Sequence, residues 1–239
     1  MGFFSFIGSA FSAVVSGICS VVSGIGSAVS SFVANVAPVI GSIIDAIKPV
    51  AEAIGRFANA FLQMLDILKP GEKIDDIGER ALQAAEVGIK PEQFDNFDDY
   101  MSKLRDFELD PEEANQRSQA EKITAGLAVG TLGAEKKFGY EQGALDTLWL
   151  LPIANAEYFT PERMQSLVST GRFTGDVFSY LEKRLSGADA TRMEKSFEAL
   201  LGENPSADAR ADLYQNLEKA RTEWQNLQAE MKTARSGES

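Results

Sequence analysis

Large apolar residues recur through the first 68 positions of the chain at steps of three or four residues. This spacing places them on one face of an α-helix, which has about 3.6 residues per turn. Valine, isoleucine, phenylalanine and glycine are mediocre or poor helix formers, so we expect other groups to bury this face. We predict that it contacts lipid or another subunit, through Phe4, Ile7, Phe11, Val15, Ile18, Val22, Ile25, Val29, Val33, Ile40, Ile43 and Ile47.

The opposite face of this segment changes character along its length. Residues 1–44 contain no charged side chain, and serine, glycine, alanine and asparagine fill the face. In lipid, small residues at this spacing let helices approach closely, and serine hydroxyls bond neighbouring carbonyls. Beyond Ile44 the face becomes charged, with acids and bases spaced to pair. We predict a helix-packing or lumen-lining face made of Ser9, Ser16, Ser20, Ser23, Ser27, Asp45, Lys48, Glu52 and Arg56.

Pro38 interrupts the segment near its middle, because proline ends or kinks a helix at the residue before it. Two arrangements are compatible with this break: a kinked rod, or a hairpin of two helices that turns near residues 35–38. About 20 apolar residues span a bilayer, so residues 3–34 are long enough for one tilted crossing.

Lys69-Pro70-Gly71 ends the apolar segment, and the composition then changes. We predict an all-α protein with two domains, an apolar Ser/Gly/Ala-rich helical segment (1–69) and an acidic helical-bundle body (70–239). In the body, cap and periodicity signals predict helices over 72–87, from Pro91, from Asp110 onward through Ile123, from Thr160, and over 174–185, 188–201 and 207–233. The charge-free run 123–134 has GxxxG spacing but is too short to cross a bilayer, which favours a tightly packed buried helix.

The net charge of −12 lies entirely in the predicted body. Three of the 35 acids and three of the 23 bases fall in residues 1–69, so residues 70–239 carry 32 acids against 20 bases. Such a surface repels phosphate backbones, and no basic stripe with interleaved aromatics is present. We therefore expect no direct binding of nucleic acid.

The sequence offers little catalytic chemistry. It contains no histidine, which removes the usual nucleophile–base pairs, histidine-ligated metal sites and the proton shuttle of neutral pH. Cys19 is the one cysteine, and it has no base near it in the sequence. Neither a calcium loop nor a phosphate loop is complete. We predict no enzyme activity, no cofactor, no metal site and no catalytic residue.

The first residues match no targeting signal. No Lys or Arg precedes Lys48, and the apolar stretch is too long for a secretory signal peptide. We expect a protein that is soluble before delivery and membrane-associated afterwards, exported by a dedicated machine or retained inside the cell.

Two functions fit these patterns. In the first, a membrane-inserting, oligomerising protein forms a pore or channel, with lipid, copies of itself and a delivery apparatus as partners. In its type the chain resembles α-helical membrane-inserting proteins, such as pore-forming toxins and phage proteins ejected into host envelopes. The alternative is a structural assembly protein of a virion, injection apparatus or filament, whose N-terminal helices bundle with other subunits. A membrane-anchored enzyme is a third, weaker hypothesis, which perturbed carboxylates in a cleft would favour.

Overall fold

The computed structural model describes residues 9–236 except 172, 174 and 203, and for 9–12 and 234–236 it describes the backbone alone. Within these residues the protein is all-helical, as the sequence predicts, and contains no strand. The N-terminal segment forms α1 (Ser9–Ser23), η2 (Ser27–Val29), α2 (Ser30–Asn35), α3 (Ala37–Ala46) and α4 (Lys48–Met64). The remainder forms α5 (Ile74–Glu86), η3 (Pro91–Gln93), α6 (Phe97–Arg105), α7 (Pro111–Gln116), α8 (Gln119–Phe138), η4 (Asp146–Trp149), α9 (Leu150–Asn155), α10 (Pro161–Ser169), α11 (Val177–Leu181), α12 (Gly187–Glu198), η5 (Ala199–Leu201) and α13 (Ala207–Ser236).

The N-terminal segment is neither a single kinked rod nor a hairpin that turns at Pro38. The chain bends at residues 35–38 as predicted, with α2 and α3 at 62° to each other. The reversal of direction occurs earlier, at Gly24–Gly26, and it brings α1 back alongside α3. A further break at Ile47 separates α3 from α4. The apolar spacing continues across these breaks, which is why the sequence pattern alone does not reveal them.

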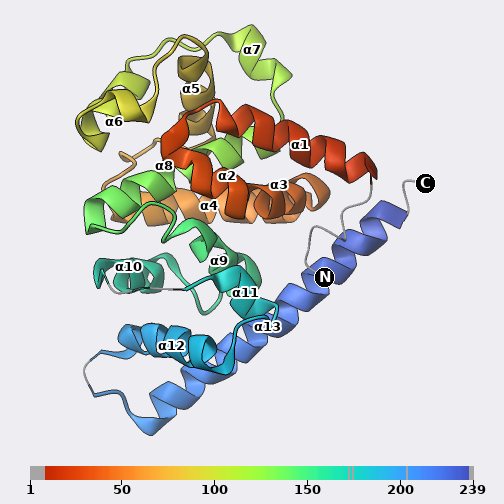
Figure 1. Cartoon of the computed structure of the whole chain (residues 1–239), viewed down its shortest axis with the longest axis vertical. Helices are drawn as coiled ribbons and strands as arrows, with labels where there is room; N and C mark the ends of the chain where they lie inside the picture. Colours follow the sequence, from red (N-terminus) through yellow and green to blue (C-terminus); the bar gives the residue numbers. More distant parts are fainter. Residues whose placement is uncertain (1–8, 172, 174, 203, 237–239) are drawn as a thin grey trace.

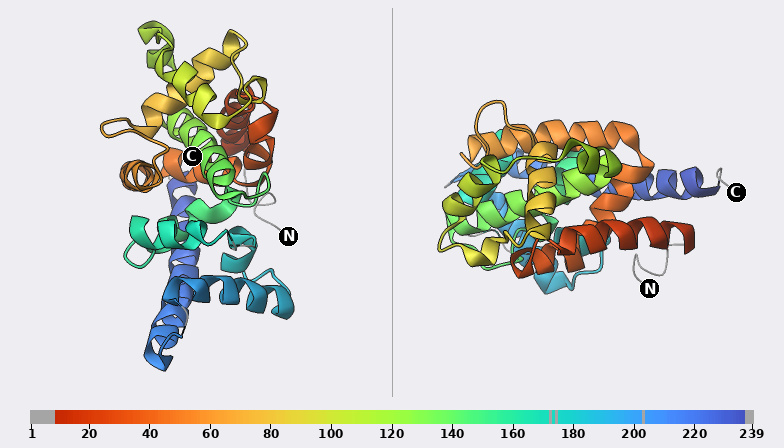
Figure 2. Two further views of the ribbon diagram at one scale, coloured as in Figure 1. Left: turned by 90° about the vertical axis from the view of Figure 1, so that its left-hand side faces the viewer. Right: turned by 90° about the horizontal axis from the view of Figure 1, so that it is seen from above.

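Helix α8 lies at the centre of the upper part of the molecule in Figure 1, where α1, α3, α4 and α5 pack around it (Figures 1 and 2). Its run 123–134 is buried, as predicted for a packed helix. The closest approach is to α5, where a Cβ at Gly78 would lie 1.9 Å from the Lys122 carbonyl oxygen. Glycine therefore permits this crossing. Below this layer in Figure 1 lie α9 to α12, and α13 runs along their side as the longest helix.

Helix caps account for several boundaries. Asp110 and Thr160 accept backbone N–H bonds at the starts of α7 and α10, as predicted. The helix from Asp110 does not continue through Ile123, because α7 ends at Gln116 and Ser118 caps α8 with a capping box. The helix predicted over 72–87 ends one residue early, at Glu86, and Val87 just beyond it is 66% exposed. The helix predicted over 174–185 is only the short α11.

One hydrophobic cluster extends from Ile18 to Met231 and includes residues from both sides of position 70. Phe61 of α4, for example, packs edge-on against Trp149 of η4, with 5.5 Å between ring centroids. The two predicted domains thus share a core in this structure. The division into segments 1–69 and 70–239 stays a prediction.

Candidate functional site

In this structure the predicted apolar face of the N-terminal segment packs inside the molecule rather than facing outward. Val15, Ile18, Val22, Ile25, Val29, Ile40 and Ile43 are buried, and Val33 and Ile47 are partly buried against the same core. Phe4 and Ile7 lie outside the described residues, as does the side chain of Phe11. Burial of this face, required by its composition, is thus supplied by the chain itself.

The predicted small-residue face is on the surface. Ser16, Ser20, Ser23 and Ser27 are exposed, while the side chain of Ser9 lies outside the described residues. Asp45, Lys48, Glu52 and Arg56 are also at the surface, and Glu52 pairs with Arg56 at 3.6 Å, as their spacing predicts. Helix α1 consequently presents serine and glycine where a water-facing helix normally presents lysine and glutamate.

No single helix in the described part of the chain has both the length and the apolar character to cross a membrane. The bent pair made of Ser27–Asn35 and Ala37–Ala46 meets that requirement when its two parts are taken together, by length and composition alone. Eight successive residues of α3, from Ala37 to Ile44, are buried in the molecule.

Hydrogen bonds from the acidic part of the chain hold this pair at two places, which we call the polar clasp (Glu92, Gln142 and Asp146). At η2, the Glu92 carboxylate accepts the Ser27 N–H at 3.0 Å. The Gln142 amide donates to the carbonyl oxygens of Ser27 and Ala28, both at 3.0 Å. The Glu92 carboxylate lies so close to Gly26 that a Cβ added there would be 2.3 Å from Oε2 of Glu92.

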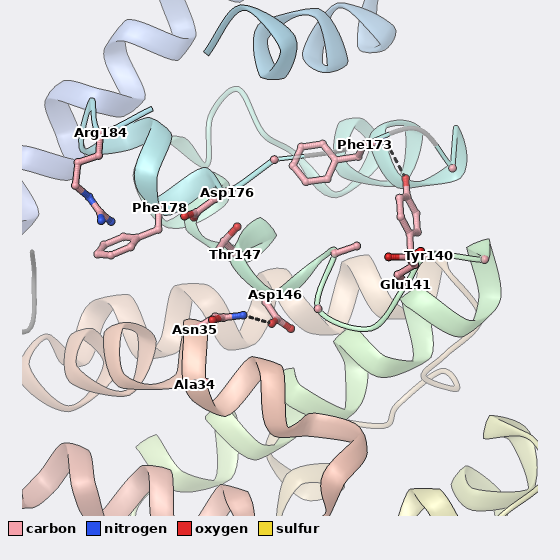
Figure 3. A pocket seen from close by; sticks show the side chains of 15 residues that line it. Ala34, Asn35, Tyr140, Glu141, Asp146, Thr147, Phe173, Asp176, Phe178 and Arg184 are labelled. Carbon is pink, nitrogen blue, oxygen red and sulfur yellow. Dashed lines mark hydrogen bonds between the residues drawn. The ribbon is translucent and has the colours of Figure 1, made fainter. Parts of the chain in front are cut away.

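The clasp reaches the end of α2 through Asn35. The Asn35 amide donates to Oδ2 of Asp146 at 3.0 Å, and the two side chains point toward one another from α2 and η4 (Figure 3). Asp146 is 2% exposed. The bond therefore joins the middle of the N-terminal segment to a buried acid.

A second buried acid, Glu135, lies beside Asp146, and we call these two residues the carboxylate pair. Oε1 of Glu135 accepts the backbone N–H groups of Gly143 at 2.9 Å and Leu145 at 3.0 Å. A Cβ on Gly143 would lie 3.3 Å from Oδ2 of Asp146 and 3.0 Å from Cβ of Ser31. Gly143 is thus the point at which the carboxylate pair and α2 meet, and its φ of 90° suits glycine.

Burial is the main reason that the pKa values of Glu135 and Asp146 are raised. It raises the pKa of Glu135 to about 7, with the Asp146 charge adding to the rise and the Leu145 and Gly143 N–H groups opposing it. Burial likewise raises the pKa of Asp146, against hydrogen bonds from Asn35 and Ser31. For Glu92 burial also raises the pKa, but hydrogen bonds from Ser27 and Ala28 help to outweigh it, and the net pKa is lowered.

A cavity of about 710 Å³ opens beside the clasp, between α2, the loop that leads into η4 and the segment around α11 (Figure 3). Three of its polar side chains have partners within the protein. Thr147 accepts the Val177 N–H at 3.0 Å, and Arg184 pairs with Glu182 at 2.7 Å. Asp176 caps α11 by accepting the Ser179 N–H. Among the described residues no group of three or more His, Cys, Asp or Glu side chains is arranged to hold a metal ion.

The sequence pattern does not predict the clasp or the carboxylate pair. Glu135 carries one usable signal, because it directly follows the charge-free run 123–134 and so continues a buried helix. Glu92, Gln142 and Asp146 carry none, since their role depends on which distant segment packs against them.

No protein family matches this chain, and neither does any curated protein or solved structure. Any assignment of function therefore depends on the geometry of the chain itself.

Proposed function

We propose that this protein inserts its N-terminal segment into a lipid membrane and oligomerises there as a pore- or channel-forming effector, or as an ejected protein. The fold in which α1 to α4 pack around α8 is the form before insertion. In the inserted form, residues 1–69 become a long apolar helix or helical hairpin, and residues 70–239 remain an acidic helical body. The target membrane and copies of the chain itself are its partners, with a delivery apparatus as a further one.

The observation that supports the proposal is the absence of charge from Ser9 to Ile44 combined with burial of α3. Transfer of a charged group into lipid is costly, and this segment would transfer none. Its large side chains would move from a protein core into hydrocarbon, which is about equally apolar. The main cost of release would be the loss of packing and of the clasp bonds.

Length also fits a crossing. Residues 27–46, straightened into one helix, would be about 30 Å long, the thickness of the hydrocarbon core, and their one charged residue, Asp45, would lie at the end of the crossing. Asn35 would then lie near mid-membrane without Asp146, and a polar amide there favours hydrogen bonds between helices. The serine and glycine face of α1 would supply close helix packing in the same assembly.

The perturbed carboxylates do not lead us to propose an enzyme. Asp146 accepts a hydrogen bond from Asn35, and Glu135 accepts two backbone N–H groups, so both groups hold structure together. We accordingly propose no catalytic residue, cofactor or metal.

The experiment uses the native thiol. Cys19 lies half-buried on α1, and a polarity-sensitive fluorophore attached there reports where α1 goes. We expect the protein to float with phosphatidylcholine vesicles and to release a dye trapped inside them. The emission of the Cys19 label should shift to the blue, and nitroxides attached to the lipid should quench its fluorescence. Cys19→Ser combined with Ala188→Cys moves the label to the exposed start of α12 and should give no shift. Absence of both flotation and a Cys19 shift would contradict the proposal.

The structural-assembly alternative is favoured by one observation, the exposed small-residue face of α1, which could pack against another subunit. It predicts large particles in buffer without lipid or detergent, whereas the membrane proposal predicts a monomer or small oligomer. Light scattering on the protein used for flotation separates the two.

A further inference from the structure

We infer that the carboxylate pair, Glu135 and Asp146, is a pH-sensitive release device that frees the N-terminal segment when the pH rises through neutral. The inference rests on the proposed function, because it concerns how the insertion segment is released. The device comprises the pair, the loop 139–146 and the Asn35 bond.

The geometry couples the two acids to the segment directly. Glu135 holds the loop through the N–H groups of Gly143 and Leu145, at 2.9 and 3.0 Å. From the same loop Gln142 bonds to η2, and from its end Asp146 bonds to Asn35 of α2. A change at Glu135 therefore acts on both places where the clasp holds the segment.

Two buried carboxylates without a counter-ion are stable only while one of them carries a proton. Glu135 and Asp146 are 3% and 2% exposed, and none of the ion pairs in the described part of the chain involves either. When both ionise, like charges repel in a poorly solvated place. The cavity that Asp146 lines leaves room for the loop to move.

The charged neighbours do not relieve this repulsion. On α8, Lys136 follows Glu135, and its positive charge lowers the pKa of Glu135 by less than any of the other causes named above changes it. The loop adds Tyr140 and the acid Glu141, and Asp176 and Arg184 lie across the cavity, with Arg184 paired to Glu182. Ser31 and Asn35, the residues of α2 that face the pair, are uncharged, and so are the residues of η2. The charged group that contacts η2 is the Glu92 carboxylate, from η3.

The sign of the effect depends on which form binds more protons. The pKa of Glu135 is about 7 in the closed form against 4.5 when the group is exposed, so the closed form binds more protons. This stabilisation is complete below about pH 4.5 and is lost as the pH rises through about 7. Between about pH 6 and pH 8 the opening constant should rise about tenfold.

Hydrogen exchange without lipid tests the device separately from insertion. Exchange of peptides covering 27–46 and 139–146, divided by intrinsic rates, should show the tenfold rise in opening from about pH 6 to pH 8. In Glu135→Gln the amide oxygen still accepts the two N–H bonds, so the rise should disappear. The matched control Glu141→Gln removes an equal but exposed charge from the same loop and should keep it.

A second variant covers the case in which Glu135→Gln does not fold. Asp146→Asn keeps the acceptor for Asn35 and removes the like charge, so its rise should be smaller than in the wild-type protein. The inference is overturned if wild-type opening is independent of pH, or if the folded Glu135→Gln or Asp146→Asn variant keeps the full rise.

Vesicle flotation at the two pH values then separates the two proposals. Tenfold opening with no flotation at either pH contradicts the proposed function and leaves the release device standing. Flat opening with equal flotation at both pH values contradicts the device and leaves the function standing.

Discussion

Gly126 has almost no space for a side chain, because α5 crosses α8 with their backbones in contact. A Cβ there would lie 2.0 Å from the Ile74 carbonyl oxygen, a backbone atom that cannot rotate away. We predict that Gly126→Ala lowers the free energy of unfolding by about 1–3 kcal/mol or more. Gly17 on α1 has nothing within 4 Å of such a Cβ, so Gly17→Ala should be neutral or stabilise by about 0.5–1 kcal/mol. Urea unfolding of both variants measures the contrast, and equal effects would contradict this packing.

Glu92 holds η2 as a carboxylate, and its contribution should depend on pH in the sense opposite to that of the carboxylate pair. Its pKa is lowered in the folded protein from 4.5, so its stabilisation is present above about pH 4.5 and is lost as the pH falls through the folded value. We predict that acid reduces the exchange protection of residues 27–35. In Glu92→Gln a neutral amide accepts the Ser27 bond at every pH, so this loss should shrink. Glu108→Gln, at a loop position outside the clasp, should behave as the wild-type protein does.

The titrations of Glu92 and Glu135 together indicate at which pH the N-terminal segment is held most firmly. Acid protonates Glu92, and rising pH ionises Glu135 beside Asp146, so both conditions weaken contacts to the same short stretch. The clasp should be strongest at mildly acidic pH, between the two transitions.

At the scale of elements, α1 and α3 lie close enough for a covalent test of whether they separate. A Cβ at Gly41 would lie 3.6 Å from Cβ of Ile18, within the range of disulfides. We predict that Ile18→Cys/Gly41→Cys, made with Cys19→Ser, forms a disulfide that stabilises the fold by up to about 3 kcal/mol. If insertion requires α1 to leave α3, the oxidised protein should release less vesicle dye, and reductant should restore the release. Cys19→Ser alone provides the control, and undiminished release after oxidation would show that the two helices move as a unit.

The sequence pattern predicts which residues of the N-terminal segment are buried far better than it predicts the path of the helices. Val22, Ile25, Ile40 and Ile43 are among the most buried side chains, because a three- and four-residue spacing identifies one face whatever the tertiary structure. The turn at Gly24–Gly26 interrupts the helix without interrupting that spacing, so periodicity gives no sign of it. Tertiary contacts decide the break, including Glu92 against Gly26 from 66 residues away.

At the scale of the whole molecule, the change of composition at position 70 predicted a boundary between domains. The structure shows that strong differences in charge can coexist with a shared core. Apolar side chains of the N-terminal segment fill the space around α8, while the acids of the remainder lie mostly at the surface. Composition indicates what the surface of a segment contacts. Whether two segments share one core depends on which of their faces pack together, and a single sequence does not give that.

Removal of residues 1–69 tests this shared core. The fragment 70–239 would lose Phe61 from its contact with Trp149 and Asn59 from α5, where the Asn59 side chain accepts the Ile74 N–H at 2.7 Å. Each large apolar side chain removed from α8 would cost about 1.5–3 kcal/mol of burial, and a domain has only about 5–15 kcal/mol of stability in total. We therefore predict that the fragment keeps helical circular dichroism but binds 1-anilinonaphthalene-8-sulfonate and loses cooperative urea unfolding. Cooperative unfolding of the fragment with no dye binding would instead support two independent domains. In that case insertion could proceed with the acidic body intact, whereas a molten fragment would require the body to loosen as the N-terminal segment leaves.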